Sequence, residues 1–263
     1  MPPKPPTRIP VAFVISADAE VVDFSGPWGV FEYVSVPGYE DSVFELFTVA
    51  ERDTPVRVSG GLTIVPTYRF DNAPAPKVIV VPAQEEPTPR ELEWIRKAAS
   101  TADLTMSVCN GAFVLGKAGL LAGKPATAHH AGYALLAATF PDVEVRRGAR
   151  FVDAERVSTS GGLTSGIDLA LHVVERYFGR EVAERTADAL EYQGQGWKDA
   201  NSNVRFAVRP VSTAEHPLCP VCEMEVDKAT APHQTFRGEE VYFCSRQDQA
   251  TFNASPERFA RDR

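Results

Sequence analysis

The chain has 263 residues, 44% hydrophobic and 24% charged, and a formal net charge of −8. This composition is typical of a folded globular protein, and the negative charge argues against a nucleic-acid surface, which needs clustered lysine and arginine. No apolar run approaches the ~20 residues that cross a membrane. Residues 1–9 are proline-rich and lack an apolar signal-peptide core, so we expect a flexible N-terminus and a cytoplasmic protein.

Short apolar runs alternate with helical patterns from residue 10 to residue 192. The pattern predicts strands over 10–15, 44–50, 77–82 and 104–108, a hairpin over 56–65, and short strands near 126–128, 143–145 and 151–152. It predicts helices over 23–34, 88–102, 132–139 and 181–192, and a long helix that follows Gly161-Gly162 and ends at Gly179. This alternation predicts an α/β domain with a mostly parallel sheet covered on both faces.

A cysteine lies at the sharpest transition in this pattern. The predicted strand 104–108 ends at Cys109, and a helix opens after Asn110 and Gly111. A strand–turn–helix of this kind pushes one side chain out of the sheet and aims the helix N-terminus at it. We therefore expect Cys109 to be a nucleophile with a lowered pKa. The alternative is a small buried hydrophobic residue at a strand end.

The last fifth of the chain differs in character. Residues 193–215 have no clear period and are interpreted as a linker, whose apolar residues Trp197, Phe206 and Val208 are expected to pack on the main domain or a partner subunit. Residues 216–260 form a small second module with three of the four cysteines. A segment of ~50 residues builds little core, so a metal is the expected support, and zinc suits cytosolic cysteines.

Three separated motifs carry a resemblance to a known family. They are DFSGP from Asp23, SVCNGAFVLGKAGLLAGKPATAHH from Ser107, and TSGGLTSGIDLALHVVERYFG from Thr159. In this order they resemble the ThiJ/PfpI superfamily, and within it the isonitrile hydratase branch. The resemblance implies a flavodoxin-like three-layer sandwich over residues 10–192, a homodimer, a small-molecule substrate and no cofactor for catalysis. Similar motifs occur in some transcriptional regulators, but no helix-turn-helix pair follows here.

The resemblance also implies site residues. Cys109 would attack the isonitrile carbon and Asp23 would act as acid and base, with Asp18 or Glu20 as alternatives for the acid. Asn110 is the third expected catalytic residue, able to hydrogen-bond a polar atom, and it stands where the branch typically has threonine. Ala83-Gln84 stand where the family has a glycine pair. His129 lies where a partner of the cysteine could be, and the alternative is a hydrogen-bonded surface residue at a strand end. The residues expected to bind substrate or shape the site are Gly26, Ala83, Gln84, Gly111, His129 and Gly162. The aromatic segment from Phe24 to Phe31, with Trp28, is expected either to line an apolar pocket or to be plain core.

The C-terminal module resembles YHS or TRASH-type metal modules through CPVCEMEV from Cys219 and YFCSRQDQATF from Tyr242. Such modules usually carry a second cysteine four residues after the FCS cysteine, where this chain has Asp248. The implied ligand set is Cys219, Cys222, Cys244 and Asp248, with His216 and His233 as spare candidates. The alternative is a metal-free remnant held by its own core.

Three functions compete at this point. The leading hypothesis is a cysteine-dependent hydratase nearest to isonitrile hydratase. The second is a glyoxalase- or amidase-like enzyme on the same thiol site. The third is a ligand, redox or metal sensor without turnover, since exposed thiolates oxidise readily.

Overall fold

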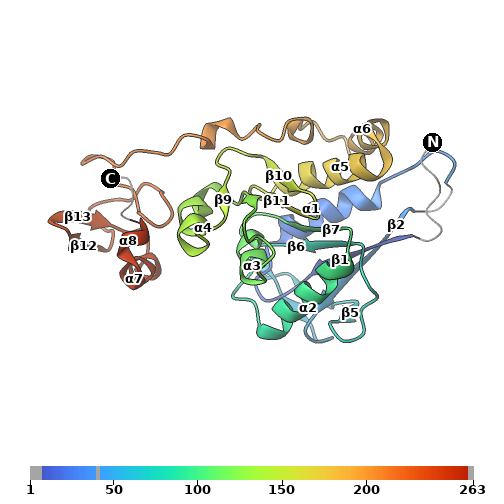
Figure 1. The fold of residues 1–263 in the computed structure, drawn as a ribbon, viewed down its shortest axis with the longest axis horizontal. Coiled ribbons are helices and arrows are strands. Elements are labelled where there is room, and N and C mark those ends of the chain that lie inside the picture. Colours follow the sequence, from blue (N-terminus) through green and yellow to red (C-terminus); the bar gives the residue numbers. More distant parts are fainter. Residues whose placement is uncertain (1–7, 40–41, 260–263) are drawn as a thin grey trace.

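The structure is a computed structural model that describes residues 8–39 and 42–259. Residues 1–7 of the predicted flexible N-terminus and residue 260 of the predicted module lie outside the described residues. Within them a seven-stranded sheet forms the centre (Figure 1). Its strands, in spatial order, are β10 (Phe151–Ala154), β11 (Val157–Ser160), β7 (Leu104–Ser107), β6 (Val78–Val81), β1 (Ile9–Val14), β2 (Phe44–Ala50) and β5 (Tyr68–Arg69). Every neighbouring pair is parallel except β10–β11.

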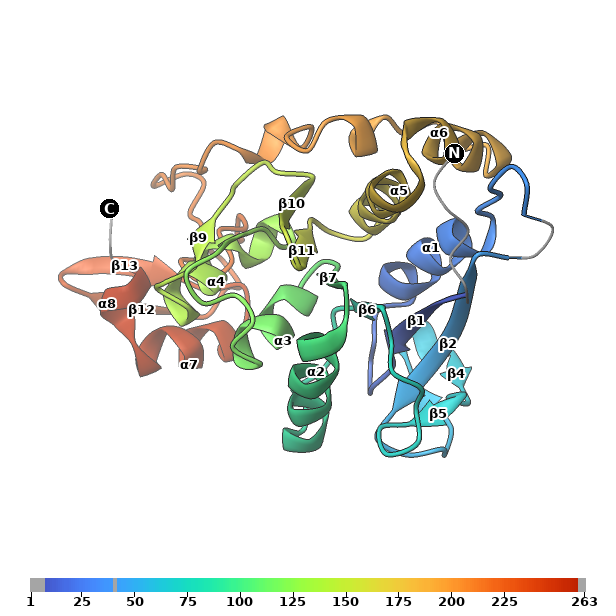
Figure 2. The ribbon, with the colours of Figure 1, turned by 45° about the vertical axis from the view of Figure 1, so that its right-hand side comes forward.

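Helices cover both faces of this sheet (Figure 2). One apolar cluster joins the sheet to α1 (Val21–Glu32), α5 (Ser165–Phe178) and α6 (Arg180–Ala189). The other joins it to α2 (Pro89–Thr101), α3 (Gly111–Lys117) and α4 (Tyr133–Thr139). Because the central strands are buried on both sides, β6 and β7 have no exposed residue, as their continuous apolar runs predict. The predicted flavodoxin-like three-layer sandwich is confirmed.

The helices and strands differ from the predicted elements in a few start positions and in one short strand. Helix α1 begins at Val21 and not at Asp23, so Asp23 lies in its first turn, where its N–H donates to the Glu20 carbonyl at 3.1 Å. Strand β5 was not predicted because it is only two residues long at the sheet edge. Two short sheets accompany the main one, β3 (Val56–Arg57) with β4 (Thr63–Ile64), and β8 (Pro125–Ala126) with β9 (Glu144–Val145). The first is the predicted hairpin.

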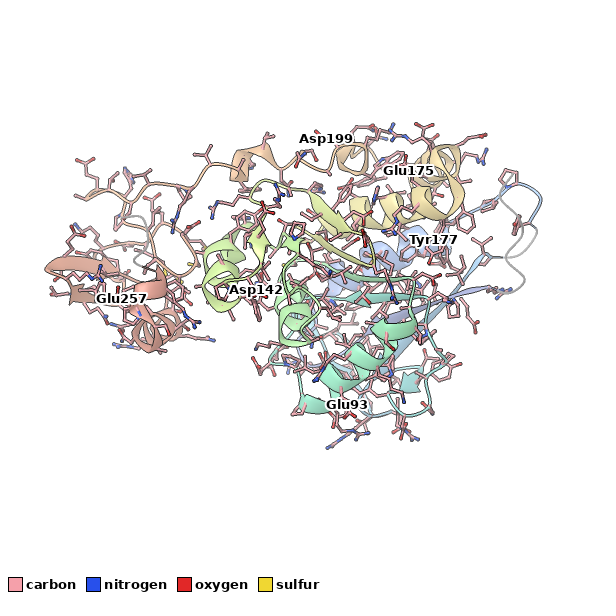
Figure 3. All side chains as sticks on the ribbon, in the orientation of Figure 1. Glu93, Asp142, Glu175, Tyr177, Asp199 and Glu257 are labelled. Carbon is pink, nitrogen blue, oxygen red and sulfur yellow. The ribbon has the colours of Figure 1, made fainter. Side chains whose placement is uncertain are left out.

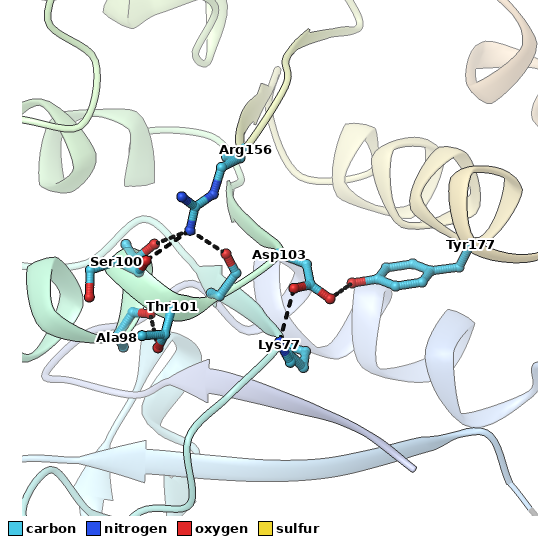
Figure 4. Close-up of polar contacts among 9 residues, drawn as sticks. Lys77, Ala98, Ser100, Thr101, Asp103, Arg156 and Tyr177 are labelled. Atoms are coloured by element: carbon cyan, nitrogen blue, oxygen red, sulfur yellow. Dashed lines mark hydrogen bonds and ion pairs between the residues drawn. The ribbon is translucent and has the colours of Figure 1, made fainter. Parts of the chain in front are cut away.

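Helix α2 shows how its ends are fixed by distant residues. At its start the Thr88 hydroxyl accepts from the Glu91 N–H at 3.2 Å. At its end Arg156 Nη2 donates to the carbonyls of Ala99, Ser100 and Ala102 at 2.7–3.1 Å (Figure 4). A cation at a helix C-terminus satisfies carbonyls that have no partner within the helix.

The segment 193–215 runs along the main domain in an extended path with two 3₁₀ turns, Gly196–Lys198 and Val204–Phe206 (Figure 1). Trp197 is buried in the core cluster beneath α5 and α6. The Phe206 ring stacks on the His130 ring with centroids 4.0 Å apart. The expectation that Trp197 and Phe206 pack on the main domain is therefore confirmed. Val208 is 80% exposed and does not pack on the main domain, so for this residue the partner-subunit alternative stays a prediction.

The C-terminal residues form the hairpin β12 (His233–Phe236) with β13 (Glu239–Tyr242), followed by α7 (Arg246–Ala254) and α8 (Pro256–Phe259). Their small core includes Phe243, Phe252 and Phe259, and it packs against Ala138 of α4. The Arg258 guanidinium donates to the Ala138 carbonyl at 3.0 Å. The module thus shares part of its core with the main domain.

Charge is spread thinly over the surface. In Figure 3 the labelled acids Glu93 of α2, Asp142 and Asp199 of connecting segments, and Glu257 of α8 lie apart from one another, and all four are exposed. Among the described residues, no helix is long and apolar enough to span a membrane.

Candidate active site and metal centre

Cys109 occupies the turn between β7 and α3, at the carboxyl end of the parallel strands. Its backbone has a φ of +58°, in the left-handed region that non-glycine residues rarely adopt. The Cys109 N–H donates to the Gly161 carbonyl, and the Val108 N–H donates to the Val81 carbonyl, both at 3.0 Å. The predicted sharp turn is therefore present, and hydrogen bonds from both neighbouring strand ends offset a conformational cost of about 1–3 kcal/mol.

Gly111 allows this turn to lie against the next strand end. A Cβ at this position would collide with the Val81 carbonyl oxygen and lie 2.8 Å from the Pro82 carbonyl oxygen. Both are backbone atoms that cannot move aside. Gly111 is therefore required by close packing of α3 against the end of β6, which brings Ala83 close to the cysteine turn.

The structure brings Asp23 to Cys109 from the first turn of α1. Asp23 is fully buried, and its Oδ2 accepts from the Ala83 N–H at 3.0 Å. Burial raises the pKa of Asp23 to about 7, and the Ala83 hydrogen bond only partly opposes this. An acid with this pKa is able to give and take a proton near neutral pH.

The expectation of a lowered thiol pKa is wrong. Burial, and then the negative charge of Asp23, raise the pKa of Cys109 to about 12. Helix α3 has only seven residues, and the Cys109 residue is 8% exposed, so the helix end does not outweigh desolvation. The pair at rest is a neutral thiol beside a carboxyl group that titrates near pH 7.

The other predicted acids have different places. Asp18 is an exposed turn residue with a φ of +52°. Glu20 accepts from the Ser59 hydroxyl at 3.2 Å, and its charge helps to raise the pKa of Asp23. Asp23 is therefore the acid that the structure places beside the thiol.

Ala83 and Gln84 differ in what they offer the site. The Ala83 N–H is occupied by Asp23, and its carbonyl accepts from the Glu20 N–H at 2.8 Å. The Gln84 side chain turns toward α2 and donates to the buried Glu91 carboxylate. Burial raises the pKa of Glu91 to about 7. Ala83 thus orients the acid, while Gln84 ties the loop to α2.

Asn110 and His129 flank the cysteine turn on the α4 side. The Asn110 amide lies against Gly132, where a Cβ would be 2.7 Å from Oδ1. The His129 ring lies against Gly162, with Cγ 3.3 Å from the position of a Cβ there. The Nδ1 of His129 accepts from the Ala131 N–H at 3.3 Å, which caps the turn before α4. This contact gives His129 a structural role in the turn before α4.

Two expected site features belong to the core. Gly26 allows α1 to approach α5, because a Cβ would lie 2.9 Å from Ile167 Cγ1. Trp28 packs on Phe13 with ring centroids 4.9 Å apart, and Phe24 and Phe31 are buried. The aromatic segment is therefore core, and the pocket interpretation is not supported.

Sequence reasoning missed Leu163. It follows the glycine pair after β11 and has a φ of +50° despite being a leucine. Its backbone N–H lies near both the Cys109 thiol and the Asp23 carboxyl group and lowers the pKa of each. Its side chain is 40% exposed. The residue type at a position does not show whether its backbone N–H faces a site. The only sequence feature that pointed to this loop is the glycine pair Gly161-Gly162.

The four predicted metal ligands come together in the C-terminal module. One ligand atom from each of Cys219, Cys222, Cys244 and Asp248 lies within 4.8 Å of the others. Asp248 Oδ2 is 3.3 Å from Cys219 Sγ and 3.1 Å from Cys244 Sγ. A hydrogen bond from Cys222 lowers the pKa of Cys219 to about 7, which favours the thiolate that binds metals. His216 instead pairs with Glu225 at 2.6 Å.

Comparison with known proteins identifies the main domain. Residues 10–176 match the DJ-1/PfpI family. The chain belongs to the DJ-1/PfpI family. A DJ-1/PfpI relative, the isonitrile hydratase of Pseudomonas putida, is 34% identical over 187 residues, which are 69% of this chain and 78% of the relative.

Two further matches are a transcriptional regulator and a solved structure. The transcriptional regulator GbdR of Pseudomonas aeruginosa, which is of the HTH type, is 30% identical over 142 residues, or 52% of this chain and 38% of the regulator. A ThiJ/PfpI protein from Pseudomonas syringae has a crystal structure that matches with a TM-score of 0.65 and 26% identity, over 79% of this chain and 88% of that protein. The family thus includes both enzymes and regulators.

Proposed function

We propose that this protein is a cysteine-dependent enzyme that hydrates small molecules, with an isonitrile as substrate and an N-substituted formamide as product. The observation that carries the proposal is the buried Cys109 thiol beside the buried Asp23 carboxyl group, whose pKa is about 7. The likeness to isonitrile hydratase supports the choice of substrate.

The reaction follows from the raised pKa values of both groups. The Cys109 thiol passes its proton through Asp23 to the terminal isonitrile carbon as sulfur bonds to that carbon, which gives a thioimidate. Asp23 then removes a proton from water as the water oxygen adds to the same carbon, and the nitrogen is protonated. The carbon–sulfur bond breaks, the sulfur regains a proton, and the formamide leaves. The sum is one isonitrile and one water converted to one formamide.

Two backbone donors support the sulfur as its charge develops. The N–H groups of Asn110 and Leu163 both lie near the Cys109 thiol and favour its ionised form. Donors fixed in advance around a developing charge are a large source of catalysis. A buried thiol with these donors therefore ionises only when a proton acceptor and a substrate are in place.

The test is formamide production from cyclohexyl isocyanide by the native protein, Cys109→Ser and Asp23→Asn. We expect turnover by the native protein alone, with Asp23→Asn reduced at least ~100-fold. Equal turnover by native protein and Cys109→Ser would refute a thiol mechanism. Absence of turnover by all three forms would refute the hydratase, and carbonyl substrates of the glyoxalase or amidase class would then be screened.

We also propose that Cys219, Cys222, Cys244 and Asp248 bind one zinc ion. The donor set fits, because three sulfurs and a carboxylate oxygen within 4.8 Å of one another suit a tetrahedral site. Cobalt added to the metal-free full chain should give the sulfur-to-cobalt absorption bands of a thiolate site. These bands should be weakened in Cys244→Ser and unchanged in His216→Ala, since His216 lies outside the cluster. Identical spectra for all three forms would refute the site.

The family resemblance supports a homodimer as well. Sedimentation of the native protein should then give twice the 28.7 kDa mass of the chain. A single species at the chain mass would contradict this.

A further inference from the structure

The loop from Gly161 to Ser165 holds Leu163 in a conformation that leucine does not favour. With its φ of +50°, Leu163 places its N–H near Cys109 and Asp23. Left-handed backbone at a non-glycine residue persists only where surrounding contacts enforce it. Backbone hydrogen bonds within the loop supply some of these contacts, such as the Gly166 N–H to the Leu163 carbonyl at 2.9 Å, and Arg150 supplies others.

Arg150 holds the loop on both sides of Leu163. Its carbonyl accepts from the Gly161 N–H at 2.9 Å, and Gly161 in turn accepts from the Cys109 N–H. Its Nη2 donates to the Thr164 hydroxyl at 3.0 Å. Thr164 is at the N-terminus of α5, but its side chain makes no capping hydrogen bond there. Its hydroxyl accepts the hydrogen bond from Arg150 instead.

The guanidinium group is itself fixed. Arg150 Nε donates to Asp168 Oδ2 at 2.6 Å, and the Tyr192 hydroxyl donates to the same oxygen at 3.0 Å. Asp168 is fully buried. From the linker, Asn203 Oδ1 accepts from Arg150 Nη1 at 3.3 Å, and the Ala200 carbonyl accepts from the Arg150 N–H at 2.7 Å. The planar fork of arginine suits three acceptors in fixed directions.

We propose that Arg150 is a positioning residue for the Cys109 site: its carbonyl holds Gly161, which accepts from the Cys109 N–H, and its guanidinium holds Thr164, the neighbour of Leu163. Arg150 touches neither the thiol nor Asp23 in any described contact, so it acts through Leu163. The linker residues Ala200 and Asn203 are part of this support, so the segment 193–215 helps to build the site as well as connecting two modules. The effect of Arg150 on turnover depends on the proposed function, whereas its effect on the reactivity of Cys109 does not.

Alkylation of Cys109 by iodoacetamide tests the proposal without any substrate. The rate is followed at pH 8 to 10 in the full chain by mass spectrometry of the Cys109 peptide, because three other cysteines also react. In Arg150→Met we expect the rate to fall roughly fivefold to tenfold, as for one lost hydrogen bond, and the pH profile to move upward. Arg146→Met is the control, because Arg146 is exposed and pairs with Glu144.

A second pair of variants keeps the test decisive if Arg150→Met fails to fold. Thr164 is exposed, so Thr164→Val removes the acceptor of Arg150 while leaving the core intact, and Thr164→Ser retains it. We expect slower alkylation in the valine variant and native rates in the serine variant. Native alkylation rates in folded Arg150→Met, or equal rates in both Thr164 variants, would overturn the proposal.

Turnover gives an independent readout. If isonitrile hydration is established, Arg150→Met should lower kcat and leave KM within about twofold, since Arg150 does not face the substrate. A raised KM with unchanged kcat would contradict the positioning role. If the native protein hydrates no isonitrile, the proposed function fails, and the alkylation profile alone still decides the role of Arg150.

Discussion

At the scale of single residues, burial controls the pKa values of Asp23 and Cys109. Both are almost completely excluded from solvent, and both have raised pKa values because the charged forms lose hydration. Asp23 keeps one hydrogen bond, from Ala83, and its other oxygen lies without a well-formed hydrogen bond to any described residue. The raised pKa keeps Cys109 as a neutral thiol at neutral pH, so a thiolate forms there only when a proton is transferred to an acceptor.

The raised pKa of Asp23 predicts a dependence of stability on pH. The folded protein holds the proton to about pH 7, whereas the unfolded chain releases it near 3.8. The stability associated with the neutral acid is therefore present below pH 4 and is lost as pH rises toward 7.

Asp23→Asn, which can still accept from Ala83, should be more stable than the native protein at pH 8 by up to about 4 kcal/mol. The two should converge at pH 4. Urea unfolding at the two pH values measures this, with the exposed residue change Asp18→Asn as control. A constant difference between native protein and Asp23→Asn at all pH values would contradict the assignment.

Gly111 gives a steric prediction at the same scale. Gly111→Ala places a Cβ against the carbonyl oxygens of Val81 and Pro82, and should destabilise the fold by roughly 3 kcal/mol. Gly29→Ala is the matched control, since Gly29 lies in α1 with no atom within 4 Å of a Cβ. That change should stabilise by roughly 0.5–1 kcal/mol through helix propensity. Similar melting temperatures for the two variants would show that the cysteine turn is not tightly packed.

At the scale of elements, α2 depends on a residue from the turn after β10. Arg156 binds three carbonyls at its end, and no other described contact of comparable extent closes this helix (Figure 4). Asp103, which follows the C-terminus of α2, accepts from Lys77 at 3.1 Å and from Tyr177 at 3.2 Å. These contacts hold α2, β7 and α5 together at the amino ends of the parallel strands, the end of the sheet opposite Cys109.

Arg156→Ala should therefore lower the free energy of unfolding by about 1–3 kcal/mol, because charged donors to carbonyls contribute this much. Arg96→Ala, which removes one exposed bond to the Leu92 carbonyl of the same helix, should cost under about 0.5 kcal/mol. Chemical denaturation of both variants separates the two cases. Equal costs would mean that Arg156 is not a helix cap in solution.

At the scale of the whole molecule, the second module is attached through Glu223, an acid next to Cys222 of the proposed metal site. Glu223 follows Cys222 and is 8% exposed at its side chain. It accepts from Arg147 of the main domain at 2.6 Å and from Arg209 of the linker at 2.7 Å. The Arg147 guanidinium in turn covers the ring of buried Tyr133, at the start of α4.

Glu223→Gln should loosen this attachment by about 1–3 kcal/mol, since two cations then face a neutral amide in a partly buried contact. Hydrogen exchange of α4 and of residues 217–226 should become faster. Glu225→Gln, on the same turn but with an exposed partner in His216, should leave exchange unchanged. Equal exchange in both variants would show that the apolar contact with Ala138 alone holds the module.

The sequence by itself determined the layers and most of the site. The strands were predicted because burial on both faces of the sheet requires an unbroken apolar run, such as residues 78–81. The helical periods between the strands and the turn at Cys109 are also local features of the sequence. In the tail, the resemblance of residues 219–226 and 242–252 to a metal module implied the four ligands, with Asp248 four residues after Cys244, and these four come together.

Only the tertiary structure decided the protonation of the site and its supports. The thiol pKa depends on how deeply Cys109 and Asp23 are buried together, and residues 86 positions apart meet only through the fold. The Leu163 N–H belongs to the backbone, and the Arg150 guanidinium binds acceptors from two separate segments, the start of α5 and the linker. Desolvation and long-range hydrogen bonds are set by the environment that the whole chain builds, so no short stretch of sequence contains them.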